Sequence, residues 1–429
     1  MLRTDGRLLR RIMKRIMNCV WFCLGLAVTL PIFSMRLEQA VQLGLKKNPD
    51  LLAAVWKARA LLDLEQAADG GAGTILKFGL VNTPTDTFSL NQDMMNQLVA
   101  GVKQRFFFPG KLSLKKDIAR ALRRIGEWDL VARRRRLIAL IKEGYFRILY
   151  LDRVMQLTET TAGLLNQFRA IARTRYAVGK GLLQDIAKAD FEAIRLKEKL
   201  IHFANDRKKA VILLNRLVGR SSETSIERLP PFKEELKQLP LTVIQNRVLV
   251  QSTSLKKAEH RLSEIKWKNK LAFRMLWPDF SIGTTYGMRT RDKTANLFSI
   301  NFELSIPIFS RQGNRVAALE KKVLMQQHSL EAVRQNVLRT AAAIFTDIRA
   351  RNKLLRLYAD RLLPLAKLSV RSALSSYRVG KLEFISLVTA QLLQYRYQVA
   401  NEKNLRIYRT HFAYLEFLTG EKLIKESGK

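Results

Sequence analysis

The pentapeptide Tyr176-Ala177-Val178-Gly179-Lys180 returns later in the chain as Tyr377-Arg378-Val379-Gly380-Lys381. The two copies lie 201 residues apart, and this offset continues without a gap as far as Gly219 and Gly420. Further identities at the same offset are Ala189 with Ala390, Arg195 with Arg396, Leu214 with Leu415 and Leu217 with Leu418. A gap-free echo of this length indicates that the chain contains two copies of one structural unit.

The echoed motif is a helix stop followed by a second helix. Glycine readily takes the left-handed conformation that ends a helix, and a nearby lysine favours the same position. Asp185 and Ser386 then lie near the start of the next predicted helix in each copy. The first motif follows Lys111–Arg175, which has no proline, and the second follows Val316–Tyr377, interrupted by Pro364. Each motif is therefore predicted to be the turn of a long antiparallel helical hairpin.

The duplication divides the chain into parts. We predict a first structural repeat at residues 35–220 (helix, β-hairpin, long helix pair) and a second at residues 241–420. A linker at residues 221–240 would join them, and residues 421–429 would form a C-terminal tail. The opening helix, residues 37–69, is expected to break and restart at Asn48-Pro49, because proline suits a first helical turn.

Residues 1–34 are predicted to be a signal peptide. Six basic residues precede an apolar run from Val20 to Phe33 that is too short to span a bilayer. A single uncleaved anchor helix is the alternative. Cys19 and Cys23 are the two cysteines of the chain, so the exported protein would have no thiol. This composition is typical of proteins in the bacterial periplasm or beyond.

The chain of 429 residues is strongly basic, with a net charge of +39 and a pI of about 10.6. Such a charge suggests polyanionic partners, namely nucleic acid, acidic lipid or lipopolysaccharide. The basic residues are spread along the whole sequence, which favours a large helical surface coated with Lys and Arg. The export signal also argues against access to DNA, so we expect no nucleic-acid partner.

Two pairs of short segments show the alternation of a β-strand. Phe298–Ile306 and Phe280–Gly287 place apolar residues on one face and Ser, Gly, Asn, Thr or Glu on the other. The first repeat has a weaker pair at Ile75–Asn82 and Gln97–Phe107. Strands of this length with one apolar face fit a membrane barrel with a wet lumen.

Four strands cannot close a barrel, and lipid does not tolerate open strand edges. The barrel is therefore expected to be shared between chains. Three chains would give twelve strands and leave room for long helices around the ring. The predicted fold class is mainly α with a small β part: long antiparallel hairpins forming a trimeric α-barrel, plus four transmembrane β-strands per chain in a shared 12-strand β-barrel.

The order of these elements resembles the TolC outer-membrane efflux family over nearly all of the exported chain. Leu37-Glu38-Gln39-Ala40 followed by Asn48-Pro49 resembles the opening helix of that family, and Trp277-Pro278-Asp279-Phe280 resembles the start of its third strand. The run from Gln104 to Lys111 resembles the strand-to-helix junction of its heavy-metal efflux branch.

The resemblance implies a passive trimeric duct in the bacterial outer membrane, with its helical part in the periplasm. The duct would contact outer-membrane lipid and dock onto a periplasmic adaptor and an RND-type or ABC-type inner-membrane pump. The docking tips would be the residues Val178, Gly179, Lys180, Val379, Gly380 and Lys381.

The resemblance also implies a gate at the tips. Asp185 and Tyr377 match two partners of the link that closes the pore in the family. Ser386 and Thr389 stand where well-known members carry pore-narrowing aspartates, and Leu382 replaces a basic residue. These departures put a carboxylate ring at the second tip in doubt. Glu383 is a further gate candidate.

No catalytic constellation stands out, and we expect neither enzymatic activity, a bound metal nor a cofactor. The four histidines, His202, His260, His328 and His411, lack metal-site spacing. The main hypothesis is the exit duct of a tripartite efflux system, and the exit duct of a type I protein secretion system is the alternative within transport. From another class, the alternative is a basic coiled-coil protein that binds nucleic acid or acts as a scaffold.

Overall fold

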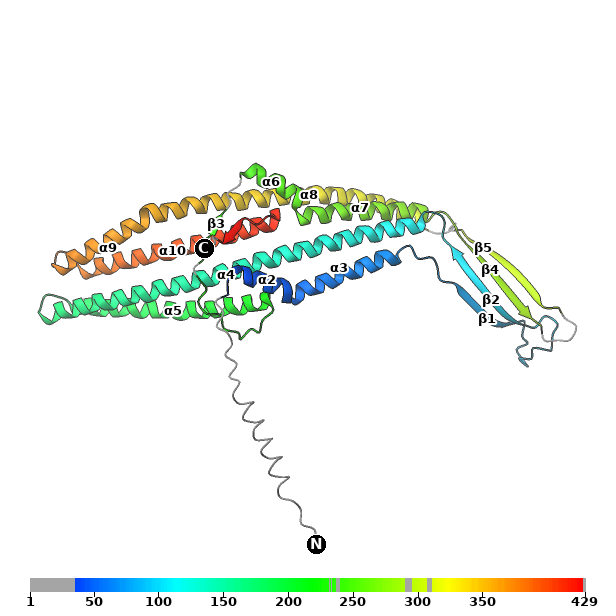
Figure 1. Cartoon of the computed structure of the whole chain (residues 1–429), viewed down its shortest axis with the longest axis horizontal. Helices are drawn as coiled ribbons and strands as arrows, with labels where there is room; N and C mark the ends of the chain where they lie inside the picture. Colours follow the sequence, from blue (N-terminus) through cyan, green and yellow to red (C-terminus); the bar gives the residue numbers. More distant parts are fainter. Residues whose placement is uncertain are drawn as a thin grey trace, which may run out of the picture.

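A computed structural model describes residues 35–230, 232, 234–236, 240–289, 295–306 and 311–426. The predicted signal segment, residues 1–34, lies outside the described residues. The molecule is elongated (Figure 1), with the turns of two helical hairpins at one end and a β-sheet at the other. The long helices between these ends run nearly side by side, so the predicted hairpin architecture is confirmed for the single chain.

The opening helix breaks where the sequence predicts. Helix α2 spans Leu37–Lys47 and α3 spans Pro49–Ala67. The Asn48 side chain caps α3 by accepting a hydrogen bond from the Leu51 N–H at 3.0 Å, and it donates to the Leu217 carbonyl at 3.0 Å. The break therefore also ties α3 to the end of the first hairpin.

The first hairpin consists of α4 (Lys111–Ala177) and α5 (Leu183–Val218). Helix α4 has 67 residues, which corresponds to about 100 Å of helix. Two of its glycines admit neighbouring helices: a Cβ at Gly126 would overlap Leu61 of α3, and one at Gly144 would touch Leu214 of α5. The lost helix propensity at these glycines is thus offset by close packing.

The second hairpin consists of α8 (Gln312–Leu357), α9 (Leu363–Arg378) and α10 (Phe384–Thr419). A π-helical turn, Tyr358–Leu362, separates α8 from α9. Pro364 follows this turn, and proline cannot donate the hydrogen bond that would continue the α-helical pattern. The interruption predicted at Pro364 is therefore present as a π turn within a continuous rod.

Two further helices repeat the arrangement of α2 and α3. Helix α6 spans Leu241–Gln251 and α7 spans Thr253–Arg274, with Ser252 accepting a hydrogen bond from the Leu255 N–H at 3.4 Å. Helix α7 packs between α4 and α8, while α3 packs on the other side of α4. The helices nearest the sheet therefore follow the order α3, α4, α7, α8.

The four predicted strands form one antiparallel sheet in the order β1-β2-β4-β5. They span Ile75–Val81, Gln97–Phe106, Asp279–Met288 and Leu297–Ser305. The register puts paired residues on one face, and the apolar set is Leu76, Phe78, Leu80, Leu98, Val102, Phe106, Phe280, Ile282, Tyr286, Met288, Phe298, Ile300, Phe302 and Leu304. Most of these side chains are exposed, so the sheet presents an uncovered apolar face.

Two sequence motifs meet where the sheet joins the helices. The Asp279 carboxylate accepts hydrogen bonds from Lys111 Nζ at 2.7 Å, Arg105 Nη2 at 2.9 Å and the Phe108 N–H at 3.0 Å. On the polar face of the sheet, Lys103 also forms an ion pair with Glu303. These contacts set the direction in which α4 leaves β2.

The linker and the tail pair with each other, which the sequence did not indicate. Strand β3 (Glu234–Leu236) forms an antiparallel ladder with β6 (Ile424–Glu426). Buried Glu416 accepts hydrogen bonds from the N–H groups of Leu423 and Ile424, both at 2.7 Å, and forms an ion pair with buried Lys142. The C-terminal segment thus belongs to the main core.

None of the helices described in residues 35–426 is long and apolar enough to cross a bilayer.

Candidate functional site

The two turns at the free end of the hairpins have the same backbone geometry. Gly179 and Gly380 lie in the left-handed region, with φ of +70° and +80°. The N–H of Lys180 donates to the Arg175 carbonyl at 2.8 Å, and the N–H of Lys381 donates to the Ser376 carbonyl at 2.9 Å. Hydrogen bonds with this spacing close the last helical turn. A residue with a β-carbon would be strained at this positive φ, so glycine is favoured at both positions. The helix stop predicted from the echo is therefore present in both copies.

The turns project into solvent on the single chain. The six residues predicted as docking tips are all exposed, and the fractional exposure of Val178 and Val379 is 63% and 69%. An apolar side chain at the apex of each turn, beside a lysine, is a chemically mixed surface that a protein partner could cover.

The two tips are tied together by a residue that sequence reasoning missed. Arg175, in the last turn of α4, donates through Nη1 to the Tyr377 carbonyl and lies 4.9 Å above the Tyr377 ring. Its Nε also donates to the Lys180 carbonyl at 3.3 Å. An added Cβ at Gly380 would lie 3.3 Å from Arg175 Nη2, so the second turn also leaves room for this guanidinium.

The comparison of the two copies could have indicated this residue, because Arg175 of the first copy is replaced by Ser376 in the second. A serine is too short to reach the other hairpin, so only the first copy contributes an arginine that contacts both turns. The two tyrosines differ in the same way: Tyr377 is 3% exposed and Tyr176 is 47% exposed. The two copies of the motif therefore have one backbone geometry and two environments.

Two of the three predicted gate residues lie close enough to interact electrostatically. Burial raises the pKa of Tyr377, and the Asp185 carboxylate raises it further. The ring of Tyr377 packs edge-on against Phe384 at 5.4 Å. Its buried hydroxyl has no hydrogen-bond partner among the described residues, so no hydrogen bond joins it to Asp185 within the chain.

The remaining gate candidate, Glu383, is exposed at the N-cap of α10 and makes no side-chain capping hydrogen bond. Ser386 and Thr389, which replace the family's aspartates, are also exposed. Within the described residues, no group of three His, Cys, Asp or Glu side chains could hold a metal ion. The tip is thus an exposed surface with charged and apolar side chains.

The sequence profile of one family, described as outer membrane efflux protein, matches residues 40–220 and 244–421. These two segments include both hairpins and all four strands of the sheet. The chain belongs to the outer membrane efflux protein family. The resemblance read from the sequence is thereby confirmed, and membership favours an efflux duct over a nucleic-acid-binding or scaffold protein.

Solved structures show the same fold at low sequence identity. The efflux protein is similar to the channel CusC (16% identity, 90% of this chain and 92% of that chain, TM-score 0.78). It is also similar to VceC of Vibrio cholerae (15% identity, 90% and 96%, TM-score 0.75) and to the open state of MtrE of Neisseria gonorrhoeae (16% identity, 92% and 91%, TM-score 0.75). No curated protein sequence matches the chain.

Proposed function

We propose that the protein is the outer-membrane channel of a tripartite efflux system, a passive exit duct with its helical part in the periplasm. The observation that carries this proposal is the uncovered apolar face of the four-stranded sheet, placed at the end of helices that reach about 100 Å from it. An apolar sheet face of this kind is stable in lipid. The helices would then extend from the membrane into the periplasm.

The open edges of the chain support a homotrimer. Strands β1 and β5 have one neighbour each in the sheet, and lipid would not tolerate their unpaired edges. At the tip end the helices follow the order α5, α4, α10, α9, so α5 and α9 are the edges. Both edges expose apolar side chains, among them Phe191, Ile194 and Ile201 on α5 and Leu365 and Leu368 on α9. Three chains joined edge to edge would bury these rows and close both barrels.

The duct would receive its cargo through partners at the tips. An adaptor protein would contact Val178, Gly179 and Lys180 of one turn and Val379, Gly380 and Lys381 of the other. Their exposure on the single chain supports this role. An inner-membrane pump would supply the energy. The division into two repeats, residues 35–220 and 241–420, would then give six tips per trimer.

Purified full-length protein tests the proposal directly. We expect heat-resistant trimers in detergent, fractionation with the outer membrane, and channels in planar lipid bilayers. A monomer in the soluble fraction that produces no conductance would overturn the proposal.

The tips would also form the gate, with Asp185 and Tyr377 as its main residues and Glu383 as a further member. The Asp185 carboxylate lies near enough to the neutral Tyr377 phenol to raise its pKa, which supports a shared role in the gate. We expect Asp185→Ala to increase the leak through the closed channel by about fivefold, the effect of roughly 1 kcal/mol on a two-state gate. Single-channel recording at neutral pH measures this change.

The matched control is Ser386→Ala, the equivalent position of the second copy. Ser386 is exposed, and its side chain makes no hydrogen bond among the described residues, so we expect this variant to conduct like the unmodified protein. Equal conductance of both variants would remove Asp185 from the gate and leave the duct itself intact.

A further inference from the structure

A cavity of about 550 Å³ lies where the end of α7 meets the start of α4, directly below the sheet. Its lining includes four large apolar side chains and two cations, namely Trp267, Lys270, Phe273, Arg274, Leu276 and Trp277. No acidic side chain lines it. Mixed apolar and cationic walls suit an amphipathic anion better than a metal or a sugar.

The apolar wall of the cavity continues the apolar face of the sheet. Trp277 stacks on Phe108 with 5.2 Å between the ring centroids. Phe106, two residues before Phe108, stacks on Phe280 with 5.2 Å between the ring centroids. Phe280 in turn stacks on Phe302 with 6.0 Å between the centroids. An apolar chain could therefore run from the cavity along the aromatic rings onto the exposed sheet face.

The two cations are free to take an anion. Lys270 and Arg274 lie one helical turn apart on α7, and both are exposed. Neither forms an ion pair within the described part of the chain, whereas the neighbouring cations Lys268 and Lys111 are paired with Glu264 and Asp279. The Lys270 ammonium lies 4.4 Å from the centre of the Trp267 ring, which directs it toward the aromatic wall.

A second copy of the chain is a poor occupant for this cavity. The cavity lies between α4 and α7, which are the inner helices of this layer, whereas the edges that would meet another chain are α3 and α8. The site therefore stays open when chains join edge to edge.

We propose that this cavity binds one anionic glycerophospholipid, with its phosphate between Lys270 and Arg274 and an acyl chain along Trp277, Phe106 and Phe280. The inference rests on the proposed outer-membrane location, which would place the cavity at the periplasmic leaflet. Aromatic side chains beside cations are typical of the level of the lipid headgroups. The bound lipid would fix the depth at which the sheet sits in the membrane.

Native mass spectrometry of the detergent-purified full-length protein tests this site. The probe is phosphatidylglycerol, compared with zwitterionic phosphatidylcholine and with soluble glycerol 3-phosphate. We expect one tightly held phosphatidylglycerol per chain, and about thirtyfold weaker retention in the double variant Lys270→Gln/Arg274→Gln, since each of the two cations near an anionic lipid contributes about 1 kcal/mol. The single variant Trp277→Ala should weaken retention without changing the charge.

The matched control is Lys367→Gln/Arg371→Gln, an exposed pair with the same spacing on α9. It should keep the unmodified lipid affinity. Equal retention in both double variants, equal affinity for phosphatidylcholine, or displacement by glycerol 3-phosphate at lipid concentrations would overturn the lipid site. Bilayer conductance separates the two proposals, because a channel that conducts but retains no lipid refutes this site alone.

Discussion

At the scale of single residues, the tip shows how one side chain can differentiate two copies of a motif. Arg175 bonds to the Tyr377 carbonyl, stacks on its ring and reaches the Lys180 carbonyl, so it contacts both turns. A guanidinium can make these contacts together because it is planar and has five donors. Ser376, its counterpart, has neither the length nor the charge.

We expect Arg175→Ala to loosen the second tip and raise the closed-channel leak by about tenfold, because a hydrogen bond to a charged group contributes about 1.5 kcal/mol. Arg175→Lys should keep the positive charge but lose the paired contacts, so its leak should be nearly as large as that of Arg175→Ala. Planar-bilayer recording gives the readout. Arg173→Ala, an exposed arginine of the same helix, is the control that should behave like the unmodified protein. Identical leaks in the Arg173 and Arg175 variants would contradict the tie.

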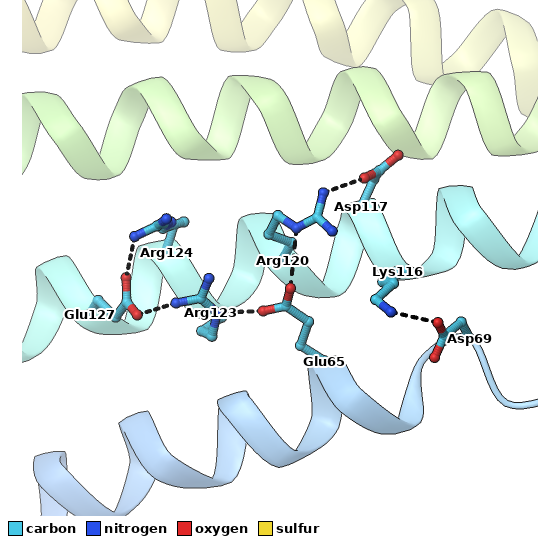
Figure 2. A network of polar contacts seen from close by, with 8 residues as sticks. All are labelled: Glu65, Asp69, Lys116, Asp117, Arg120, Arg123, Arg124 and Glu127. Atoms are coloured by element: carbon cyan, nitrogen blue, oxygen red, sulfur yellow. Dashed lines mark hydrogen bonds and ion pairs between the residues drawn. The ribbon is translucent and has the colours of Figure 1, made fainter.

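At the scale of elements, a network of ion pairs joins the end of α3 to α4. Helix α3 buries Leu51 and Ala54 near its start, and its end is held by the network in Figure 2. Glu65 lies between Arg120, at 3.2 Å, and Arg123, which also pairs with Glu127. The hydrogen bond from Arg123 lowers the pKa of Glu65. The side chain of Glu65 is 12% exposed, whereas Asp69, paired with Lys116, is 40% exposed.

We expect acid to weaken this end of α3. Because the pKa of Glu65 is lower in the folded chain, its ion pairs stabilise the folded state above the ordinary glutamate pKa, and this contribution disappears as the pH falls through the lowered value. Glu65→Gln should lower the protection factors of the α3 amides at pH 7. It should also remove most of the dependence of these protection factors on pH. Hydrogen exchange between pH 7 and pH 3 measures both effects.

Asp69→Asn is the control in the same network. An exposed single pair contributes little, so this variant should exchange like the unmodified chain. If amide protection in α3 depends on pH equally in Glu65→Gln and in the unmodified chain, α3 is held by its apolar contacts instead.

At the scale of the whole molecule, the sheet has two chemically different faces. Ile300 lies on the apolar face and is 69% exposed on the single chain, whereas its neighbour Asn301 points to the polar face with Glu303 and Gly283. The same substitution at these two positions therefore tests which face would meet lipid and which would line the lumen.

We expect Ile300→Arg to reduce assembly into the outer membrane, because an arginine on the lipid face near the middle of a barrel strand costs about 2–4 kcal/mol. Asn301→Arg adds the same charge one residue away and should assemble normally, with a change in ion selectivity. The yield of heat-resistant trimers in the outer-membrane fraction measures assembly. Comparable loss in both variants would mean that both faces are packed.

Local patterns determined much of this protein. The break at Asn48, the two glycine turns, the four strands and the interruption at Pro364 were all predicted, because each depends on backbone preferences or on the period of apolar residues within a few positions. The tip residues could be located from the echo for the same reason.

Contacts between segments that are distant in the sequence depend on how the whole chain packs. The Arg175 tie to Tyr377, the ladder between β3 and β6, and the fit of Leu61 over Gly126 join residues that no local pattern connects. These contacts depend on how the two hairpins and α3 pack side by side. The difference between the two tips therefore arises from packing, while their shared shape arises from the sequence of each turn.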